Sequence, residues 1–191
     1  MQLLLLEEAQ RFLEQEFANV EPELVDGLVL NRFALGTSEI RRVESLLGLG
    51  DLPASFTDLI QTYDFGNFSL FNTQFGGAST GSLDWLLAYN DLTQFGLEQF
   101  LVDARRLELV LIATGDPFAF FLQVRTGVVS AMTDEQPLTA MLPVAESFPH
   151  FIQGLATAYQ ALRRERIPEF RELARQEFGE AAYRFWYELT F

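Results

Sequence analysis

Three short apolar segments joined by tight turns constrain the fold of this chain more than any other feature of its sequence. They cover residues 108–114, 118–124 and 128–132, and the turns between them are built from Gly, Asp, Pro, Arg and Thr. Short apolar segments bounded by such turn residues are typical of β-strands. Because strands joined by short turns most simply reverse direction, the sequence predicts an antiparallel meander.

Phenylalanine is concentrated in the middle segment, at Phe118, Phe120 and Phe121. Rings in such a group can stack on the bases of a nucleic acid, but that mode of binding needs basic neighbours that this segment lacks. We therefore expect a strand that is buried on both faces.

Helical periodicity surrounds the predicted strands. Apolar residues recur at helical spacing in five parts of the chain, namely residues 2–18, Thr37 to Leu47, Pro53 to Gly66, residues 146–166, and beyond Pro168. A further strand is expected near residues 67–73, whereas residues 83–91 are either a short helix or an apolar lining segment. We predict an α+β fold in one domain, residues 1–191, with an antiparallel-rich central sheet packed with helices.

The stretch from residue 46 to residue 68 joins two of the expected helices to the strand near residues 67–73. Gly48 supplies the positive φ that ends a helix, Pro53 suits the first turn of the next one, and Gly66 is placed to end it. Upstream, Thr37 is a hydroxyl residue suited to N-capping. We interpret these residues as determinants of local conformation and not as a ligand site.

Charge excludes some classes of partner. The chain has 27 acidic and 13 basic residues, all of the latter arginine, and a formal net charge of −14. Nucleic acids and anionic membrane surfaces are disfavoured, because their binders present basic patches. A basic protein is the natural partner, since an acidic surface speeds its approach. Solubility alone is the alternative explanation of the charge.

The chain has no cysteine, which excludes disulfides, a thiol nucleophile and cysteine-bound metal, and fits a reducing compartment. Four leucines follow the first two residues, but Glu7 and Glu8 end the run before it reaches the length of a signal-peptide core or a membrane span. We therefore expect a cytoplasmic protein without a membrane segment.

Catalytic and metal-binding motifs are weak. His150 is the single histidine, and no G-x-S-x-G elbow accompanies it, so we interpret it as a capping or surface residue. Asp116 lies between Gly115 and Pro117, where it can close an Asx-turn in the hairpin. Paired carboxylates could hydrolyse glycosides, but their separation is not visible in a sequence. We predict no catalytic residue, no cofactor and no metal site.

Two groups of residues are candidates for contact with a protein partner. Acidic residues at loops and element ends could meet basic groups: Asp64, Asp84, Asp91, Asp103, Glu108 and Asp116. Aromatic residues near the C-terminus, Trp186 and Tyr187, could lie exposed at a helix end and form a partner contact or a homodimer contact.

The order of these elements resembles the SUKH superfamily. The residues that carry the resemblance are Leu47, Gly48, Leu52 and Pro53 at the helix junction, Gly66 at the turn, and Ala113, Gly115 and Asp116 near the hairpin. It covers residues 38–160 and leaves an N-terminal helical extension, residues 1–36, and a C-terminal one, residues 161–191. The resemblance implies a SUKH-like fold and a non-catalytic binding role, as in bacterial toxin-immunity proteins and fungal cell-wall assembly regulators.

We therefore expect a protein-binding domain that is not an enzyme, foremost an immunity protein that neutralises a basic toxin domain by binding it. A scaffold or regulator of cell-envelope or signalling assemblies is the alternative. A carboxylate-dependent hydrolase is a third hypothesis.

Overall fold

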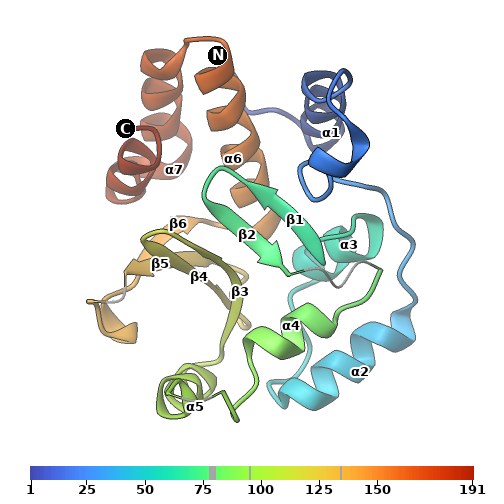
Figure 1. Cartoon of the computed structure of the whole chain (residues 1–191). Coiled ribbons are helices and arrows are strands. Elements are labelled where there is room, and N and C mark those ends of the chain that lie inside the picture. Colours follow the sequence, from blue (N-terminus) through green and yellow to red (C-terminus); the bar gives the residue numbers. More distant parts are fainter. Residues whose placement is uncertain (78–80, 95, 134) are drawn as a thin grey trace.

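A computed structural model of the chain describes residues 1–77, 81–94, 96–133 and 135–191. Within these residues one antiparallel sheet of six strands runs in the order β1-β2-β3-β4-β5-β6, each strand pairing with its neighbours in the chain (Figure 1). The strands are β1 (Asn67–Leu70), β2 (Thr73–Gly76), β3 (Leu109–Gly115), β4 (Phe118–Gln123), β5 (Val129–Thr133) and β6 (Leu142–Ala145). The predicted α+β class and the meander of β3, β4 and β5 are confirmed.

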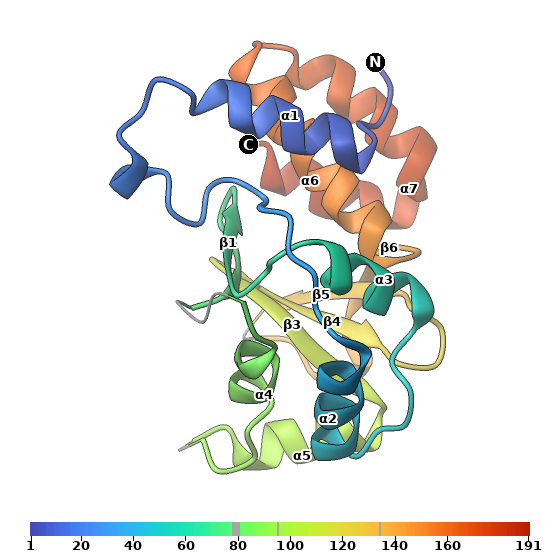
Figure 2. The ribbon, with the colours of Figure 1, turned by 90° about the vertical axis from the view of Figure 1, so that its right-hand side faces the viewer.

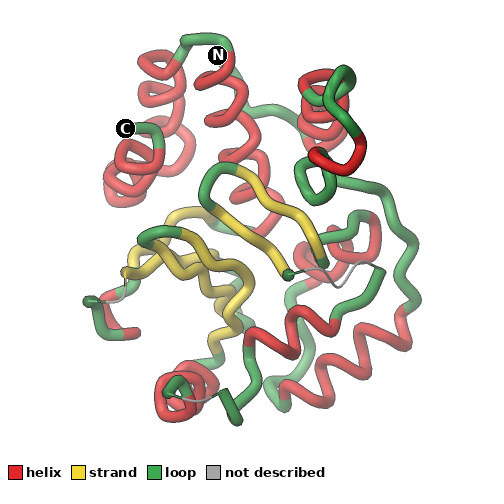
Figure 3. The backbone as a smooth tube through the Cα atoms, in the orientation of Figure 1, coloured by secondary structure: helices red, strands yellow, loops and turns green. Residues whose placement is uncertain are grey.

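Helices cover the sheet in two groups, which Figure 2 shows above and below the strands and Figure 3 marks in red. The helices are α1 (Leu6–Glu16), α2 (Thr37–Leu47), α3 (Ala54–Thr62), α4 (Asp84–Tyr89), α5 (Glu98–Arg106), α6 (Phe148–Arg163) and α7 (Ile167–Leu189), with 3₁₀ turns η1 (Pro22–Leu24) and η2 (Leu138–Ala140). In Figure 2, α1, α6 and α7 lie above the strands, and α2, α4 and α5 lie below them. Buried residues of α2 and α4 nevertheless belong to the same core as those of α6 and α7. None of the described helices is both long and apolar enough for a membrane crossing.

Several short elements differ from the expectations. The strand expected at residues 67–73 is a hairpin, in which Leu70 pairs with Thr73 across a two-residue turn. Residues 84–89 are a helix, so the first of the two alternatives for this segment is correct. The sequence did not predict α5 or β6. A strand of four residues that contains Pro143 shows too little alternation to be recognised.

The junction between α2 and α3 has the conformation that its residues favour. Gly48 ends α2 with φ 67° and donates its N–H to the carbonyl of Glu44 at 3.0 Å. The Glu44 carboxylate then accepts the N–H of Leu52 at 2.8 Å, so one residue stabilises both ends of the turn. The N-cap expected at Thr37 is wrong, because the helix begins at that residue and Gly36 precedes it without a side-chain cap.

Alternating residues of β3, β4 and β5 enter two separate apolar clusters. Val110, Ile112 and Phe120 face the main core, which also holds buried residues of every helix except α5. A second cluster lies on the opposite face and consists of Ala104, Leu109, Leu111, Phe121 and Met132. Phe120 and Phe121 are both buried, which confirms the prediction of a strand buried on both faces.

Helix α7 differs from the expected periodicity because it is interrupted at Gly179, where φ is 79° and ψ is 166°. The interruption leaves Ala181 exposed and Ala182 buried in the second half of the helix. It also places Trp186 inside the main core, 0% exposed, with its Nε1–H donated to the carbonyl of Val144 at 3.1 Å. The prediction that Trp186 is exposed at a helix end is therefore wrong.

Candidate binding surfaces

Five of the six acidic residues predicted to meet a partner have partners within the chain. Three of them form ion pairs with arginines: Asp84 with Arg42 at 2.6 Å, Asp103 with Arg106 at 3.1 Å, and Glu108 with Arg125 at 2.5 Å. Arg42 also bonds to Glu39, and this arginine holds the pKa of both carboxyls below their ordinary values. All of these side chains are accessible to solvent, so the pairs contribute little to stability.

Two of the remaining three, Asp64 and Asp91, bond to backbone. Asp64 accepts the N–H of Gly66 at 2.8 Å and that of Gly81 at 2.7 Å, which holds the turn that leads into β1. Asp91 accepts the N–H of Thr93 at 2.9 Å and its hydroxyl at 2.8 Å, and these bonds lower the pKa of the Asp91 carboxyl. Both are local structural uses that the sequence did not indicate.

The predicted residues do not form one surface. Asp84, Asp91, Asp103 and Glu108 lie on or beside α4 and α5, at the lower end of the molecule in Figure 1. Asp116 lies in the β3–β4 turn, preceding a cis bond to Pro117, and no side-chain hydrogen bond of an Asx-turn joins it to the described residues.

Tyr187 is separate from these acids. It lies on α7, at the other end of the molecule, and is 38% exposed beneath the guanidinium of Arg171, which lies 4.0 Å from its ring centre. The expected exposure of Tyr187 is correct, whereas its neighbour Trp186 cannot contact a partner in the folded chain because it is buried.

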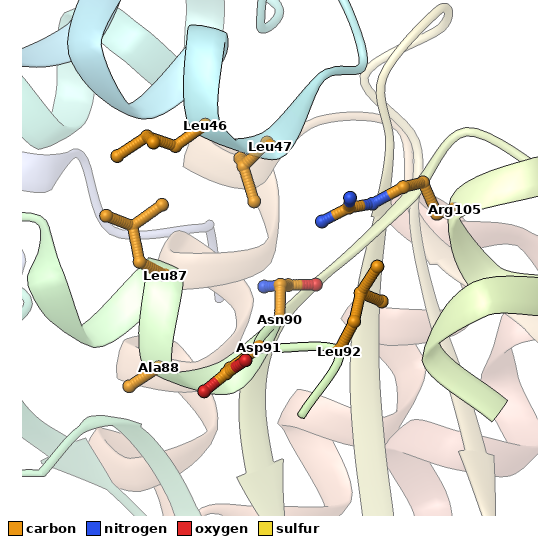
Figure 4. Close-up of a pocket in the computed structure, with 8 residues that line it drawn as sticks. All are labelled: Leu46, Leu47, Leu87, Ala88, Asn90, Asp91, Leu92 and Arg105. Carbon is orange, nitrogen blue, oxygen red and sulfur yellow. The ribbon is translucent and has the colours of Figure 1, made fainter. Parts of the chain in front are cut away.

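A hollow of about 410 Å³ lies between the C-terminal ends of α2, α4 and α5 (Figure 4). We call it the leucine hollow, and it is lined by Leu46, Leu47, Leu87, Ala88, Asn90, Asp91, Leu92 and Arg105. At the edge of the hollow, Leu46 of α2 is 57% exposed, whereas the next residue of the same helix, Leu47, is buried. An exposed leucine beside a hollow is a feature of binding surfaces.

The polar groups of the leucine hollow differ in what they can offer a ligand. Asn90 is saturated, because its amide donates to the carbonyls of Leu86 and Leu111 at 2.8 and 2.9 Å and accepts the N–H of Leu111 at 2.9 Å. In Figure 4 the guanidinium of Arg105 reaches from α5 into the hollow, while the carboxylate of Asp91 points away from it. Among the described residues Arg105 has no hydrogen-bond, ion-pair or aromatic partner, so its charge is available.

A second hollow, of about 480 Å³, lies on the other side of α5, where Phe100 and Leu107 face Leu138 of η2. Asp103 and Arg106 line it as well, but they are paired with each other. Helix α5 thus separates two hollows with mainly apolar linings. The sequence did not reveal either one, because both depend on how α5 packs on the sheet.

The acidic segment, residues 7–26, covers α1 and η1 and carries seven carboxylates and one arginine. This gives a net charge of −6 from a total of −14. Within the described residues, Glu16 is the only one of the seven that forms an ion pair, with Arg163. The ratio of seven to one is visible in the sequence, whereas the six acids predicted to meet a partner all lie outside this segment.

Exposed apolar residues lie among these acids. Val20 is 40% exposed and Leu24 is 66% exposed, and between them Glu21 and Glu23 are exposed as well. In Figure 2 the connection that follows α1 extends to the left of the sheet. The exposed side chains of Val20 and Leu24 on this connection are open to a partner.

His150 is the residue closest to a catalytic arrangement. Its Nδ1 is buried without a hydrogen bond, and Glu146 Oε1 lies 3.8 Å away. Ser147 accepts the backbone N–H of His150 and is not bonded to its ring, so no nucleophile and base are paired here. The ring stacks on Phe178 with centres 4.5 Å apart, and the interpretation of His150 as a surface or capping residue is wrong, because Ser147 is the N-cap.

No group of three or more histidine, aspartate or glutamate side chains in the described residues is arranged to hold a metal ion. Neither a scan against protein-family models nor a search of the curated proteins finds a match for this chain.

Proposed function

We propose that this chain is a non-catalytic binding domain for a basic protein, and foremost an immunity protein that neutralises a toxin domain by covering it. The observation that carries the proposal is the acidic segment, residues 7–26, in which unpaired carboxylates surround exposed apolar side chains. This combination favours protein binding, since charge brings a partner near and apolar contact retains it.

The distribution of ion pairs supports this location. Around α4 and α5 three acids, Asp84, Asp103 and Glu108, are paired with nearby arginines, so the field of these three at a distance is weak. In the acidic segment the charge is nearly uncompensated, and a field of one sign accelerates association with an opposite charge by about 10- to 1000-fold at low salt. Leu24 and Val20 are the apolar anchors that we assign to the contact.

The resemblance of residues 38–160 to the SUKH superfamily also supports an immunity role, and the acidic segment then belongs to the extension outside that match. A scaffold or regulator of cell-envelope or signalling assemblies would use the same surface.

For a carboxylate hydrolase the best pair is Glu146 and Glu177, which line one cavity beside His150. Both are exposed, whereas a glycosidase holds its acid in an apolar setting.

The test compares two variants of equal charge. One replaces three acids of the segment (Glu21→Gln, Glu23→Gln and Asp26→Asn), and the control replaces three exposed acids elsewhere (Asp58→Asn, Glu165→Gln and Glu177→Gln). A partner captured from the native host is purified, and its association rate is measured against salt. We expect the first variant to associate about 3- to 10-fold more slowly at low salt, with a difference that shrinks above about 0.15 M.

An association rate that is independent of salt, or that falls equally in both variants, would contradict the proposal. Leu24→Asp should shorten the lifetime of the complex, whereas Leu162→Asp, at another exposed leucine, on α6, should not. Growth of cells that express the captured partner then separates the two roles. Protection by this chain supports immunity, and a harmless partner supports a scaffold.

A further inference from the structure

The leucine hollow is not used by the proposed function, and we infer that it binds the carboxylate of a compact apolar acid, through Arg105. The shared chemistry of the ligand is one carboxylate next to a branched aliphatic group. A free carboxylic acid and the C-terminal residue of a leucine-ending peptide both provide it. This inference concerns a different surface from the acidic segment and does not depend on the basic partner.

Arg105 is exceptional among the arginines of this chain. Seven of the thirteen form ion pairs with carboxylates: Arg42, Arg106, Arg125, Arg163, Arg166, Arg175 and Arg184. Arg105 is half-buried, faces a hollow and has no such partner among the described residues, although acids outnumber bases two to one. A half-buried cation without a partner loses part of its hydration, and an anionic ligand would restore the lost interactions.

The lining determines the rest of the ligand. Leu46 and Leu47 from α2 face Leu87 and Leu92 from α4 and the loop after it, so the hollow offers aliphatic contacts from two sides (Figure 4). Its volume of about 410 Å³ is at the lower end of the range for small-molecule pockets, roughly 300 to 1,000 Å³. A group the size of a leucine side chain fits such a space and would bury its methyl groups against these residues.

The other polar residues restrict the ligand to a single negative group. Asn90 has used its amide in three backbone hydrogen bonds and holds the wall of the hollow in place. Asp91 remains ionised because Thr93 bonds to it and lowers the pKa of its carboxyl. Its carboxylate points away from the hollow, so among the described lining residues Arg105 is the one charged group that a ligand meets, and a single negative group finds a cation there.

The experiment is an NMR titration of the ¹⁵N-labelled chain with N-acetyl-leucine and with N-acetyl-leucinamide, which differ in the carboxylate alone. We expect saturable shifts at residues 87–92 and 101–107 for the acid, with a dissociation constant on the order of 1 mM, and at least about tenfold weaker binding for the amide. Equal binding of the two compounds, or no saturable shift at these residues, would overturn the inference.

Two arginine variants provide the matched pair. Arg105→Gln should weaken the binding of N-acetyl-leucine by about tenfold, whereas Arg106→Gln, the next residue on α5, should leave it unchanged because Arg106 faces the second hollow. If Arg105→Gln disturbs the spectrum of the folded chain, Leu46→Asp is the second variant. It places an anion at the exposed edge of the leucine hollow and should also prevent binding. Retained affinity in both Arg105→Gln and Leu46→Asp would refute the inference.

A third ligand, 4-methylpentanoate, separates the two sources of the carboxylate. It keeps the branched chain and the carboxylate but lacks the acetamide group that stands for the preceding peptide unit. Binding as tight as that of N-acetyl-leucine indicates a free acid as the ligand, and clearly weaker binding indicates a chain terminus. Absence of binding by both acids contradicts the inference and leaves the proposal for the acidic segment unaffected.

Discussion

The two faces of the sheet are built from alternating residues of the same strands, yet they are covered very differently. The face that holds Val110, Ile112 and Phe120 meets α6 and α7 and forms a core dense in phenylalanine rings. The opposite face holds Leu109, Leu111 and Phe121 in a small cluster, whose one buried helical residue among those described is Ala104 of α5, with Phe100 of α5 and Tyr89 of α4 packed against it partly exposed. The main core is continuous, whereas the second cluster ends at two open hollows.

This difference shows where binding can develop in such a fold. The dense core encloses even Trp186, whose indole N–H bonds to the backbone of the edge strand β6. A short helix such as α5 cannot cover its face completely. The apolar residues left at its margins, among them Leu46 and Leu107, remain available to a ligand.

The largest expected effect is in the main core. Phe151 is fully buried, and its ring centre lies 4.9 Å from that of Phe120. Phe151→Ala should lower the free energy of unfolding by about 4 to 5 kcal/mol, because the surrounding rings cannot close the cavity. Urea denaturation measures this, with Phe191→Ala as the control, since Phe191 is almost fully exposed and its loss should matter little.

The same change in the second cluster should cost less. Phe121 is equally buried, and it packs edge-on against Phe100 of α5 at 5.9 Å. Because α5 lies between two hollows, it can shift into the space, and we expect Phe121→Ala to cost about 3 kcal/mol. Hydrogen exchange should speed up in α5 and not in α6. If Phe121→Ala lowered the free energy of unfolding as much as Phe151→Ala, and hydrogen exchange sped up equally in α5 and α6, the two faces of the sheet would not differ in how they tolerate a cavity.

The next effect tests the polar link at the border of the second cluster. Asn90 joins the end of α4 to β3 through both backbone groups of Leu111. Asn90→Ala leaves those buried groups without partners and should cost about 1 to 3 kcal/mol. Denaturation measures the loss against Gln99→Ala, an exposed position on α5. An unchanged free energy of unfolding would mean that water replaces the amide as the partner of Leu111, and that water reaches this side of the sheet.

The smallest effect concerns pH. Arg42 bonds to Glu39 and Asp84 and lowers the pKa of each carboxyl from ordinary values of 4.5 and 3.8. A carboxyl whose pKa is lowered in the folded chain stabilises the fold at pH values above its ordinary pKa. This stabilisation is lost as the pH falls through the pKa of the folded chain. Arg42→Gln should return both pKa values toward the ordinary ones. The free energy of unfolding should then depend less on pH between about pH 5 and pH 3. NMR titration of the two carboxyls measures it, and unchanged pKa values would contradict the role of Arg42.

Much of the fold follows from local patterns. The apolar segments of β3, β4 and β5 and the tight turns between them suffice to predict the meander, because short turns leave few other ways to pair. Gly48 ends α2 as expected, since a positive φ suits glycine better than any other residue. Neither α5 nor β6 could be recognised, because each is short and is held by tertiary contacts instead of its own propensity.

The candidate sites were much less accessible to sequence reasoning. The sequence by itself determined the amount of charge, the identity of its carriers and the excess of acids in residues 7–26, since these are properties of composition. Only the tertiary structure decided which acids are free, because Arg42 and Asp84 lie 42 positions apart and meet only when α2 packs on α4. The same holds for Trp186, which is buried beyond the interruption of α7 at Gly179, and for Arg105, which has no side-chain partner among the described residues because of where the fold places its neighbours.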